Sequence, residues 1–142
     1  MASSAAIKAY GAVHDTDPKK VIFDALKGFL EKVEPNGADY MVCVYERPEQ
    51  MQMDSGVKLY IPATASRRTE DKFQGNVGLI VKAGPNVDDH AHRFHGGKVP
   101  QVGDWVGFST TDAIQFVLGE RMIRLLKADF VRFVLTDPDC VI

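Results

Sequence analysis

Five side chains of the types that bind metal ions stand close together in the second half of the chain. The group consists of Asp88, Asp89, His90, His92 and His95. A His-x-His pair with a third histidine could bind zinc or nickel. The glycines beside the group are typical of an exposed loop, so we expect a solvated or subunit-contact loop and no metal. A metal-binding module is kept as a third interpretation.

No other pattern in the sequence indicates catalysis. The chain contains no nucleophile elbow, P-loop, dinucleotide fingerprint or Ser-His-Asp order. Arg67, Arg68 and Lys72 could contact a phosphate, but Glu70 and Asp71 interrupt the positive charge. The sequence therefore predicts a protein that is not an enzyme and that uses no cofactor.

Composition excludes several classes of protein. The chain has 142 residues, 45% of them hydrophobic, which is enough for one domain with a real core. Its net charge of -2 argues against a general nucleic-acid surface, and no apolar run is long enough to span a membrane. Cys43 and Cys140 are too far apart for a zinc knuckle or a redox pair, which favours a cytoplasmic protein with reduced thiols.

An apolar triplet, Leu59, Tyr60 and Ile61, stands at the start of a long polar stretch. The residues around it are poor strand formers with little to bury, so a loop over about 52–74 is expected. Two interpretations stay open. In one, the triplet and Val57 dock into an apolar groove of a partner. In the other, the segment is a strand with Val57, Leu59 and Ile61 on its inner face.

The N-terminal part predicts an arm followed by an amphipathic helix. Residues 1–16 are small and polar. Asp17 is a plausible N-cap, Pro18 suits the first helical position, and Pro35 and Gly37 end the helix. The apolar stripe of this helix consists of Ile22, Leu26, Phe29, Leu30 and Val33. We assign residues 1–37 to this arm and helix.

From residue 38 onward the chain consists of short apolar segments separated by glycines and charged residues. Six of them are expected to be strands: "DYMVCVYERP", "NVGLIVKAG", "GDWVGF", "AIQFVLG", "RMIRLL" and "FVRFVL". In "NVGLIVKAG", Val77, Leu79 and Val81 should lie on one face and Ile80 on the other. The fold class is mainly β, and a small closed or partly closed β-barrel over residues 38–142 is expected.

Four segments, in their order along the chain, resemble the co-chaperonin family, whose bacterial member is GroES. They are "YMVCVYERPE", "SGVKLYIPATA", "GNVGLIVKAGPN" and "VPQVGDWVGFST". The second is similar to the family's mobile loop, and the closing strands follow in "FVLGERMIRLLKADFVRFV". The histidine-rich segment, about 85–99, takes the place of the family's roof hairpin. The resemblance covers about two-thirds of the chain and implies a GroES-like β-barrel.

The resemblance implies a non-enzymatic cap for a chaperonin chamber, with ATP chemistry left to the chaperonin. The partner-binding residues would be Val57, Leu59, Tyr60 and Ile61. Neighbouring subunits would pair their first and last strands in a homo-oligomeric ring, which the family implies is a heptamer. These strands, "YMVCVY" and "FVRFVL", are long and apolar, and we expect a monomer to leave both as open edges. The interface residues expected here are Tyr40, Val42, Val44, Phe130, Arg132 and Val134.

The chain departs from the family pattern in its arm and helix, in its longer loop after Ile61 and in its histidine-rich segment. These additions suggest a bacteriophage-encoded relative that assists capsid-protein folding in the host cytoplasm. The alternative is a virion structural protein, such as a head decoration or cement subunit, that reuses the barrel. Extended N-termini often join neighbouring capsid subunits, which motivates this second interpretation.

Overall fold

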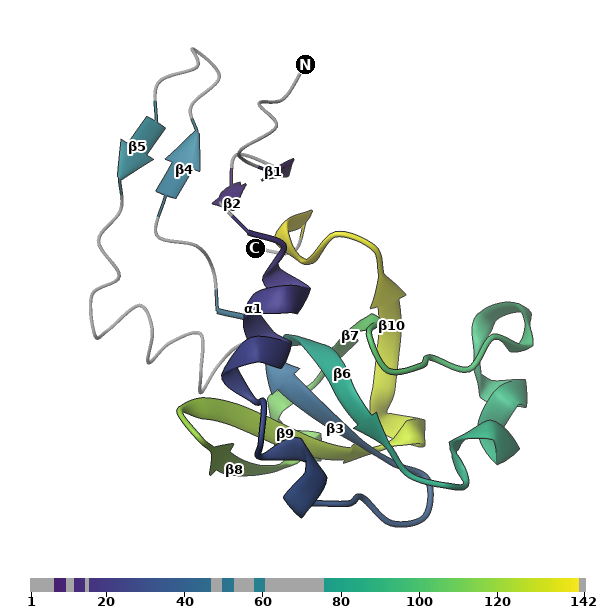
Figure 1. Ribbon diagram of the computed structural model, residues 1–142. Helices are drawn as coiled ribbons and strands as arrows, with labels where there is room; N and C mark the ends of the chain where they lie inside the picture. Colours follow the sequence, from purple (N-terminus) through teal and green to yellow (C-terminus); the bar gives the residue numbers. More distant parts are fainter. Residues whose placement is uncertain are drawn as a thin grey trace.

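A six-stranded antiparallel sheet forms the body of the protein (Figure 1). The structure is a computed structural model and describes residues 7–9, 12–14, 16–46, 50–52, 58–60 and 76–140. The strands are β3 (Asp39–Val44), β6 (Val77–Ala83), β7 (Trp105–Phe108), β8 (Ile114–Leu118), β9 (Arg121–Lys127) and β10 (Val131–Leu135). Their order is β10-β7-β6-β3-β9-β8. All six predicted strands are therefore confirmed.

Four further strands of three residues each form a second sheet, which was not predicted. They are β1 (Ile7–Ala9), β2 (Ala12–His14), β4 (Gln50–Gln52) and β5 (Lys58–Tyr60), in the order β1-β2-β4-β5. β1 pairs with β2, β4 pairs with β5, and a bridge between Ala12 and Met51 joins the two hairpins. Part of the predicted arm is thus paired with the segment that precedes the apolar triplet.

The predicted helix begins as expected and ends early. α1 spans Pro18–Ala25, and the side chain of Asp17 accepts a hydrogen bond from the backbone N–H of Lys19 at 3.0 Å. Gly28 has a φ of +86°, a conformation that glycine adopts without strain, and it interrupts the helix. The chain then forms the 3₁₀ helix η1 (Leu30–Lys32) before it enters β3.

The helix and the sheet share one hydrophobic core. Ile22 and Leu26 are buried, and Leu30 and Val33 also pack against this core. The sheet contributes residues of β3, β6, β7 and β9: Met41, Cys43, Leu79, Val81, Trp105 and Ile123. Four of the five stripe residues therefore pack on their own chain, as their spacing indicates, whereas Phe29 is 40% exposed.

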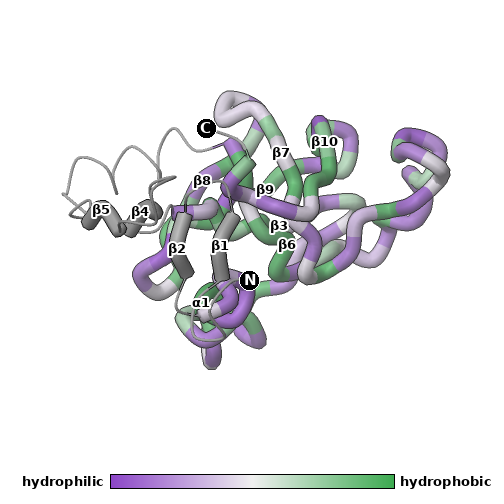
Figure 2. Tube along the Cα trace, turned by 90° about the horizontal axis from the view of Figure 1, so that it is seen from above, coloured by the Kyte–Doolittle hydropathy of each residue, from purple (hydrophilic) through white to green (hydrophobic). Residues whose placement is uncertain are grey.

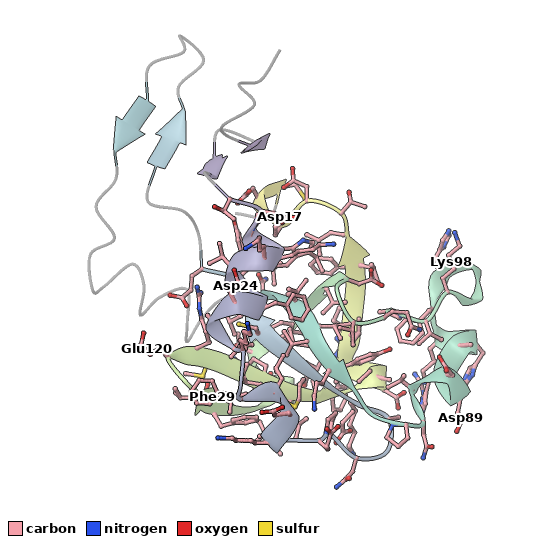
Figure 3. The ribbon with its side chains drawn as sticks, viewed as in Figure 1. Asp17, Asp24, Phe29, Asp89, Lys98 and Glu120 are labelled. Atoms are coloured by element: carbon pink, nitrogen blue, oxygen red, sulfur yellow. The ribbon has the colours of Figure 1, made fainter. Side chains whose placement is uncertain are left out.

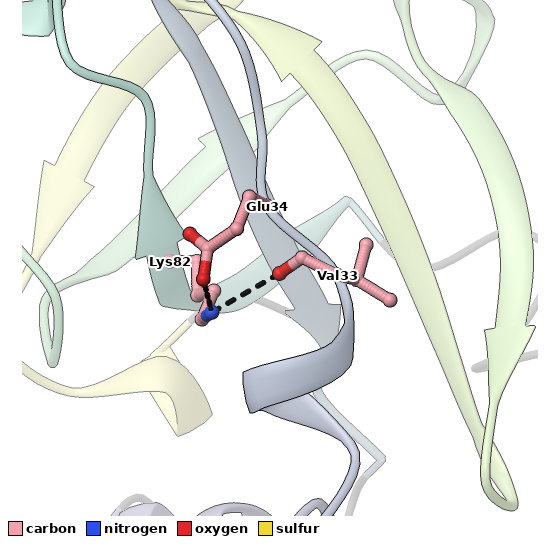
Figure 4. Close-up of polar contacts among 3 residues, drawn as sticks. All are labelled: Val33, Glu34 and Lys82. Carbon is pink, nitrogen blue, oxygen red and sulfur yellow. Dashed lines mark hydrogen bonds and ion pairs between the residues drawn. The ribbon is translucent and has the colours of Figure 1, made fainter.

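A polar contact fixes the segment after the helix to the sheet (Figure 4). Lys82, on β6, donates hydrogen bonds to the backbone oxygen of Val33 at 3.1 Å and to the carboxylate of Glu34 at 2.5 Å. The contact with the backbone oxygen positions the chain where it turns from η1 toward β3.

The opposite face of the sheet is buried as well. Its core contains Tyr40, Val42, Val44, Ile80, Val106, Phe108, Met122 and Leu126. Figure 2 shows hydrophobic residues concentrated along these strands. The two faces alternate as predicted in β6, where Val77, Leu79 and Val81 belong to the helix-side core and Ile80 to the other.

A short connection shows that the sheet is rolled. β9 and β10 are four strand spacings apart in the sheet, about 19 Å if the sheet were flat. Only the 3₁₀ helix η5 (Ala128–Phe130) joins them, and four residue steps span roughly 14 Å at most. The sheet must therefore curl until the end of β9 meets the start of β10.

The roll stops short of a closed barrel. Among the described strands, β10 and β8 are the two ends of the sheet order and do not pair with each other. They approach at one corner, where Arg132 of β10 lies 3.3 Å from Asp112 in the 3₁₀ helix η4 (Thr110–Asp112) just before β8. The antiparallel β prediction is confirmed, but this part of the chain forms an open, rolled sheet.

The segment predicted as a roof-like loop contains two 3₁₀ helices, η2 (Val87–Arg93) and η3 (His95–Gly97). Figure 1 shows it projecting from the sheet beyond β10. His90 and Arg93 both contact the same carboxylate oxygen of Asp129 in η5 at 2.9 Å. The last 3₁₀ helix, η6 (Pro138–Cys140), is held by a hydrogen bond from Tyr45 to Asp139.

Candidate partner-binding surfaces

The predicted partner-binding segment lies partly in β5, outside the six-stranded sheet. Lys58, Leu59 and Tyr60 pair in register with Gln52, Met51 and Gln50 of β4. Figure 1 shows this hairpin on the far side of α1 from β10. Val57 and Ile61 lie outside the described residues.

This position bears on both interpretations of the triplet. Residues 58–60 do form a strand, as the second interpretation holds. That strand belongs to the four-stranded sheet, so it is not a strand of the rolled sheet. The partner-binding role of Val57, Leu59, Tyr60 and Ile61 stays a prediction.

The expectation that the first strand of the barrel is an open edge is wrong. β3 lies between β6 and β9 and pairs with both. Tyr40, Val42 and Val44 are buried in the core opposite the helix and are at most 1% exposed. The sequence "YMVCVY" is apolar throughout because both faces of this central strand are covered. These three side chains cannot form a subunit contact without opening the core.

β10 does have one open edge within the described residues. It pairs with β7 alone, and its register shifts between Val131 and Phe133. Arg132 and Val134 are exposed and Phe130 is half-buried. The predicted interface on the last strand therefore remains accessible.

A close contact with β7 positions the aromatic side chain of β10. Phe133 lies over Gly107, where a Cβ atom would come within 2.0–2.3 Å of the ring. A larger residue at this position would therefore force the ring to move.

A groove of about 680 Å³ runs beside β10. We call it the β10 groove. It lies between this strand, the turn from Arg93 to Pro100 and the first turn of α1, which contributes Lys19. Phe94, Val99 and Phe133 supply apolar lining. This volume is in the range of small-ligand pockets. It is also large enough to hold the side chains of an added strand.

The β10 groove is positively charged on a chain whose net charge is -2. Its lining contains four cationic side chains and one carboxylate: Lys19, Arg93, Lys98, Arg132 and Asp104. Arg93 and Arg132 are paired with carboxylates of the same chain. Within the part of the chain that the structure describes, Lys19 and Lys98 have no ion-pair partner. The groove thus favours an acidic or polar-rimmed partner.

β8 is the other open edge of the rolled sheet, and it is unusually apolar. Ile114 is 69% exposed and Val117 is 61% exposed. Each side chain is on a different face of the strand, because positions three apart in a strand point in opposite directions. Exposed edges of this kind are templates for pairing with another strand.

The turn that carries the histidines does not assemble a metal site from described residues. His92 and His95 are exposed, and His90 stacks on His92 with ring centroids 6.4 Å apart. No group of three or more histidine, cysteine or acidic side chains within 16–46 and 76–140 is arranged to hold a metal ion. Asp88 and Asp89 are exposed on the same turn.

A buried arginine next to the β8 edge was not predicted. Arg124 of β9 is 2% exposed, and one of its terminal nitrogens donates a hydrogen bond to the amide oxygen of Gln115 at 2.5 Å. Burial lowers the pKa of this guanidinium. The contact fixes β8 to β9 on the face opposite α1.

No surface role was predicted for Ile114, Val117 or Lys19. A signal existed for β8, because "AIQFVLG" has apolar residues on both faces and only one polar residue, as two-sided burial or pairing would require. No local signal could place Lys19 beside β10, since more than one hundred residues separate them.

Comparison with known proteins adds no family assignment. A scan against protein-family models and a search of curated proteins found no match to this chain. In the described residues no helix is long and apolar enough to cross a membrane.

Proposed function

We propose that this protein is a non-enzymatic co-chaperonin, an oligomeric cap that binds the rim of a chaperonin ring. The single observation that supports this best is the position of residues 58–60. They lie in a hairpin outside the rolled sheet, at the place in the chain where the resemblance implies a partner-binding loop. Val57, Leu59, Tyr60 and Ile61 then form the contact.

The energetics suit a reversible cap. Each aliphatic side chain that is buried contributes roughly 1.5–3 kcal/mol, and ordering the loop costs back several kcal/mol. A single loop therefore binds weakly. Several loops on one assembly bind together, because effective concentration raises the avidity by about 10²–10⁴-fold. Weak individual contacts let the cap dissociate once a few of them release.

Capture by an immobilised chaperonin ring with nucleotide tests the proposal. The full-length protein should be retained, and a Leu59→Asp/Ile61→Asp double variant should lose retention at least about 100-fold, since two buried aliphatic side chains are worth 3 kcal/mol or more. Val102→Asp is the matched control, because Val102 is an exposed apolar residue in a turn of the rolled sheet. Equal retention of the double variant and the control would refute the assignment of the contact.

A virion structural protein is the second candidate, and the bridge between β2 and β4 favours it. This bridge adds the N-terminal hairpin to the β4–β5 hairpin within one chain. The same addition between two chains would join neighbouring subunits, as N-terminal arms do in capsids. Mass spectrometry of purified particles distinguishes the candidates: the cap is absent from the finished particle, whereas a cement subunit is present in stoichiometric amounts.

A further inference from the structure

The two open edges of the rolled sheet match each other in length and direction. β8 and β10 have five residues each. Strand direction alternates along the order β10-β7-β6-β3-β9-β8, so the two end strands run in opposite senses. A β10 strand of one copy laid against β8 of the next copy would continue the antiparallel alternation.

The exposed apolar side chains of the edges also correspond, face by face. On β10, Phe133 is paired with Gly107 and Val134 with Val106, which places the two side chains on opposite faces of the sheet. Phe133 is 42% exposed and Val134 is 53% exposed. On β8, Ile114 is paired with Leu125 and Val117 with Met122, again on opposite faces.

In one register both faces of a joined sheet would bury apolar surface, with Ile114 left beyond the end of β10. Val134 and Val117 lie on the face opposite α1, because their partners Val106 and Met122 belong to that core. Phe133 lies on the helix face, as Phe116 and Leu118 of β8 do. An antiparallel register that sets Val134 against Val117 also sets Phe133 against Leu118.

The charges beside the two edges are complementary. The β10 groove carries Lys19, Lys98 and Arg132, whereas the turn after β8 carries the exposed carboxylate of Glu120. In the register above, Glu120 comes to the start of β10, beside Arg132. Figure 3 shows Glu120 and Lys98 on opposite sides of the molecule, so one chain cannot join its own two charges.

We propose that the β10 groove and the β8 edge are the two halves of a head-to-tail interface between copies of this chain. Contacts of this type use two different surfaces, so they generate a closed ring or an open filament instead of a two-fold dimer. The proposal rests on the proposed function in one respect, which is that a chaperonin cap consists of several copies of the chain. The strand contact itself is tested without any chaperonin.

Cysteine cross-linking tests the interface in the full-length protein. In a Cys140→Ser background, Val117→Cys and Val134→Cys are made separately and treated with a short bis-maleimide. Cys43 does not interfere, because it is buried and burial raises its pKa to about 12. Each variant alone should stay uncross-linked, a mixture of the two should give covalent dimers, and the double variant should give a ladder of multimers.

Every other pattern overturns the proposal. Dimers from Val134→Cys alone or Val117→Cys alone would show a two-fold contact. A double variant that cross-links only within one chain would show that β8 and β10 close the barrel themselves. A mixture of Val117→Cys with Val102→Cys, an exposed site on neither edge, is the control for random collision. A cross-linked ladder with no chaperonin capture would refute the proposed function and leave the interface standing.

Discussion

The helix and the rolled sheet should unfold as one unit, and Leu26→Ala tests this. Leu26 is fully buried in the core between α1 and the sheet. A buried Leu→Ala substitution costs about 2–5 kcal/mol, through lost burial and the cavity left behind. For a domain of this size about 3 kcal/mol lowers the midpoint of thermal unfolding by roughly 6–12 °C.

Trp105 makes the assay specific, because it is the single tryptophan and lies in β7, far from the helix in sequence. It is buried in the same core and packs edge-on against Tyr45 with ring centroids 5.2 Å apart. Its fluorescence therefore reports unfolding of the sheet. Leu26→Ala should shift the Trp105 transition and the far-UV circular dichroism transition together.

Val21→Ala is the matched control on the same helix. Val21 is 41% exposed, so its truncation should change stability by less than about 0.5 kcal/mol. If Leu26→Ala removes helical signal and leaves the Trp105 transition where it was, then residues 1–37 and the sheet are separate units. That result would exclude a core shared by the helix and the sheet.

Two other substitutions probe the sheet. Gly107→Ala should destabilise the protein by about 1–3 kcal/mol, because its methyl group would collide with the Phe133 ring, and urea unfolding should show a smaller cost in a Phe133→Ala background. Burial, with Asp88 and Asp104 nearby, raises the pKa of Tyr40 to about 12, so folding favours the neutral phenol. This contribution to stability is complete below pH 10, and it is lost between pH 10 and pH 12 at about 1.4 kcal/mol per pH unit. Tyr40→Phe should reduce the alkaline slope and leave the part due to Cys43, whose pKa burial also raises to about 12; an unchanged slope would exclude Tyr40 as a source.

The six strands could be predicted because each is a short apolar run between residues that favour turns. The turn before β7 is an example: Gly103 has a φ of +97°, and the backbone N–H of Asp104 donates to the carbonyl of Gln101 at 3.0 Å. Such turns depend only on residues that are neighbours in the sequence, so they can be predicted from it. The helix cap at Asp17 was predictable for the same reason.

Strand order could not be predicted in the same way. "YMVCVY" was interpreted as an open edge because it is long and apolar, but unbroken apolar character is what a strand covered on both faces requires. The covering helix precedes it in sequence and was assigned to a separate region. The early end of α1 at Ala25 was also missed, because Gly28, which has a φ of +86° in the turn that follows, costs a helix only about 1 kcal/mol and does not by itself predict a stop.

The three residues of η5 link the core to the open edges. Because Ala128, Asp129 and Phe130 are too few to cross a flat sheet, they force the roll that encloses Tyr40, Val42 and their neighbours. The same connection brings β10 to the corner near Asp112, where Arg132 pairs with that carboxylate and β10 keeps one unpaired side among the described strands. A longer connection would let the sheet flatten and would expose the core on its concave face. Pairing of β10 with β8 within one chain would instead remove both open edges. The short η5 connection thus determines both the concave core and the position of the open edge at β10. We therefore expect substitutions that stiffen η5, or insertions that lengthen it, to change the stability of the fold and its assembly together.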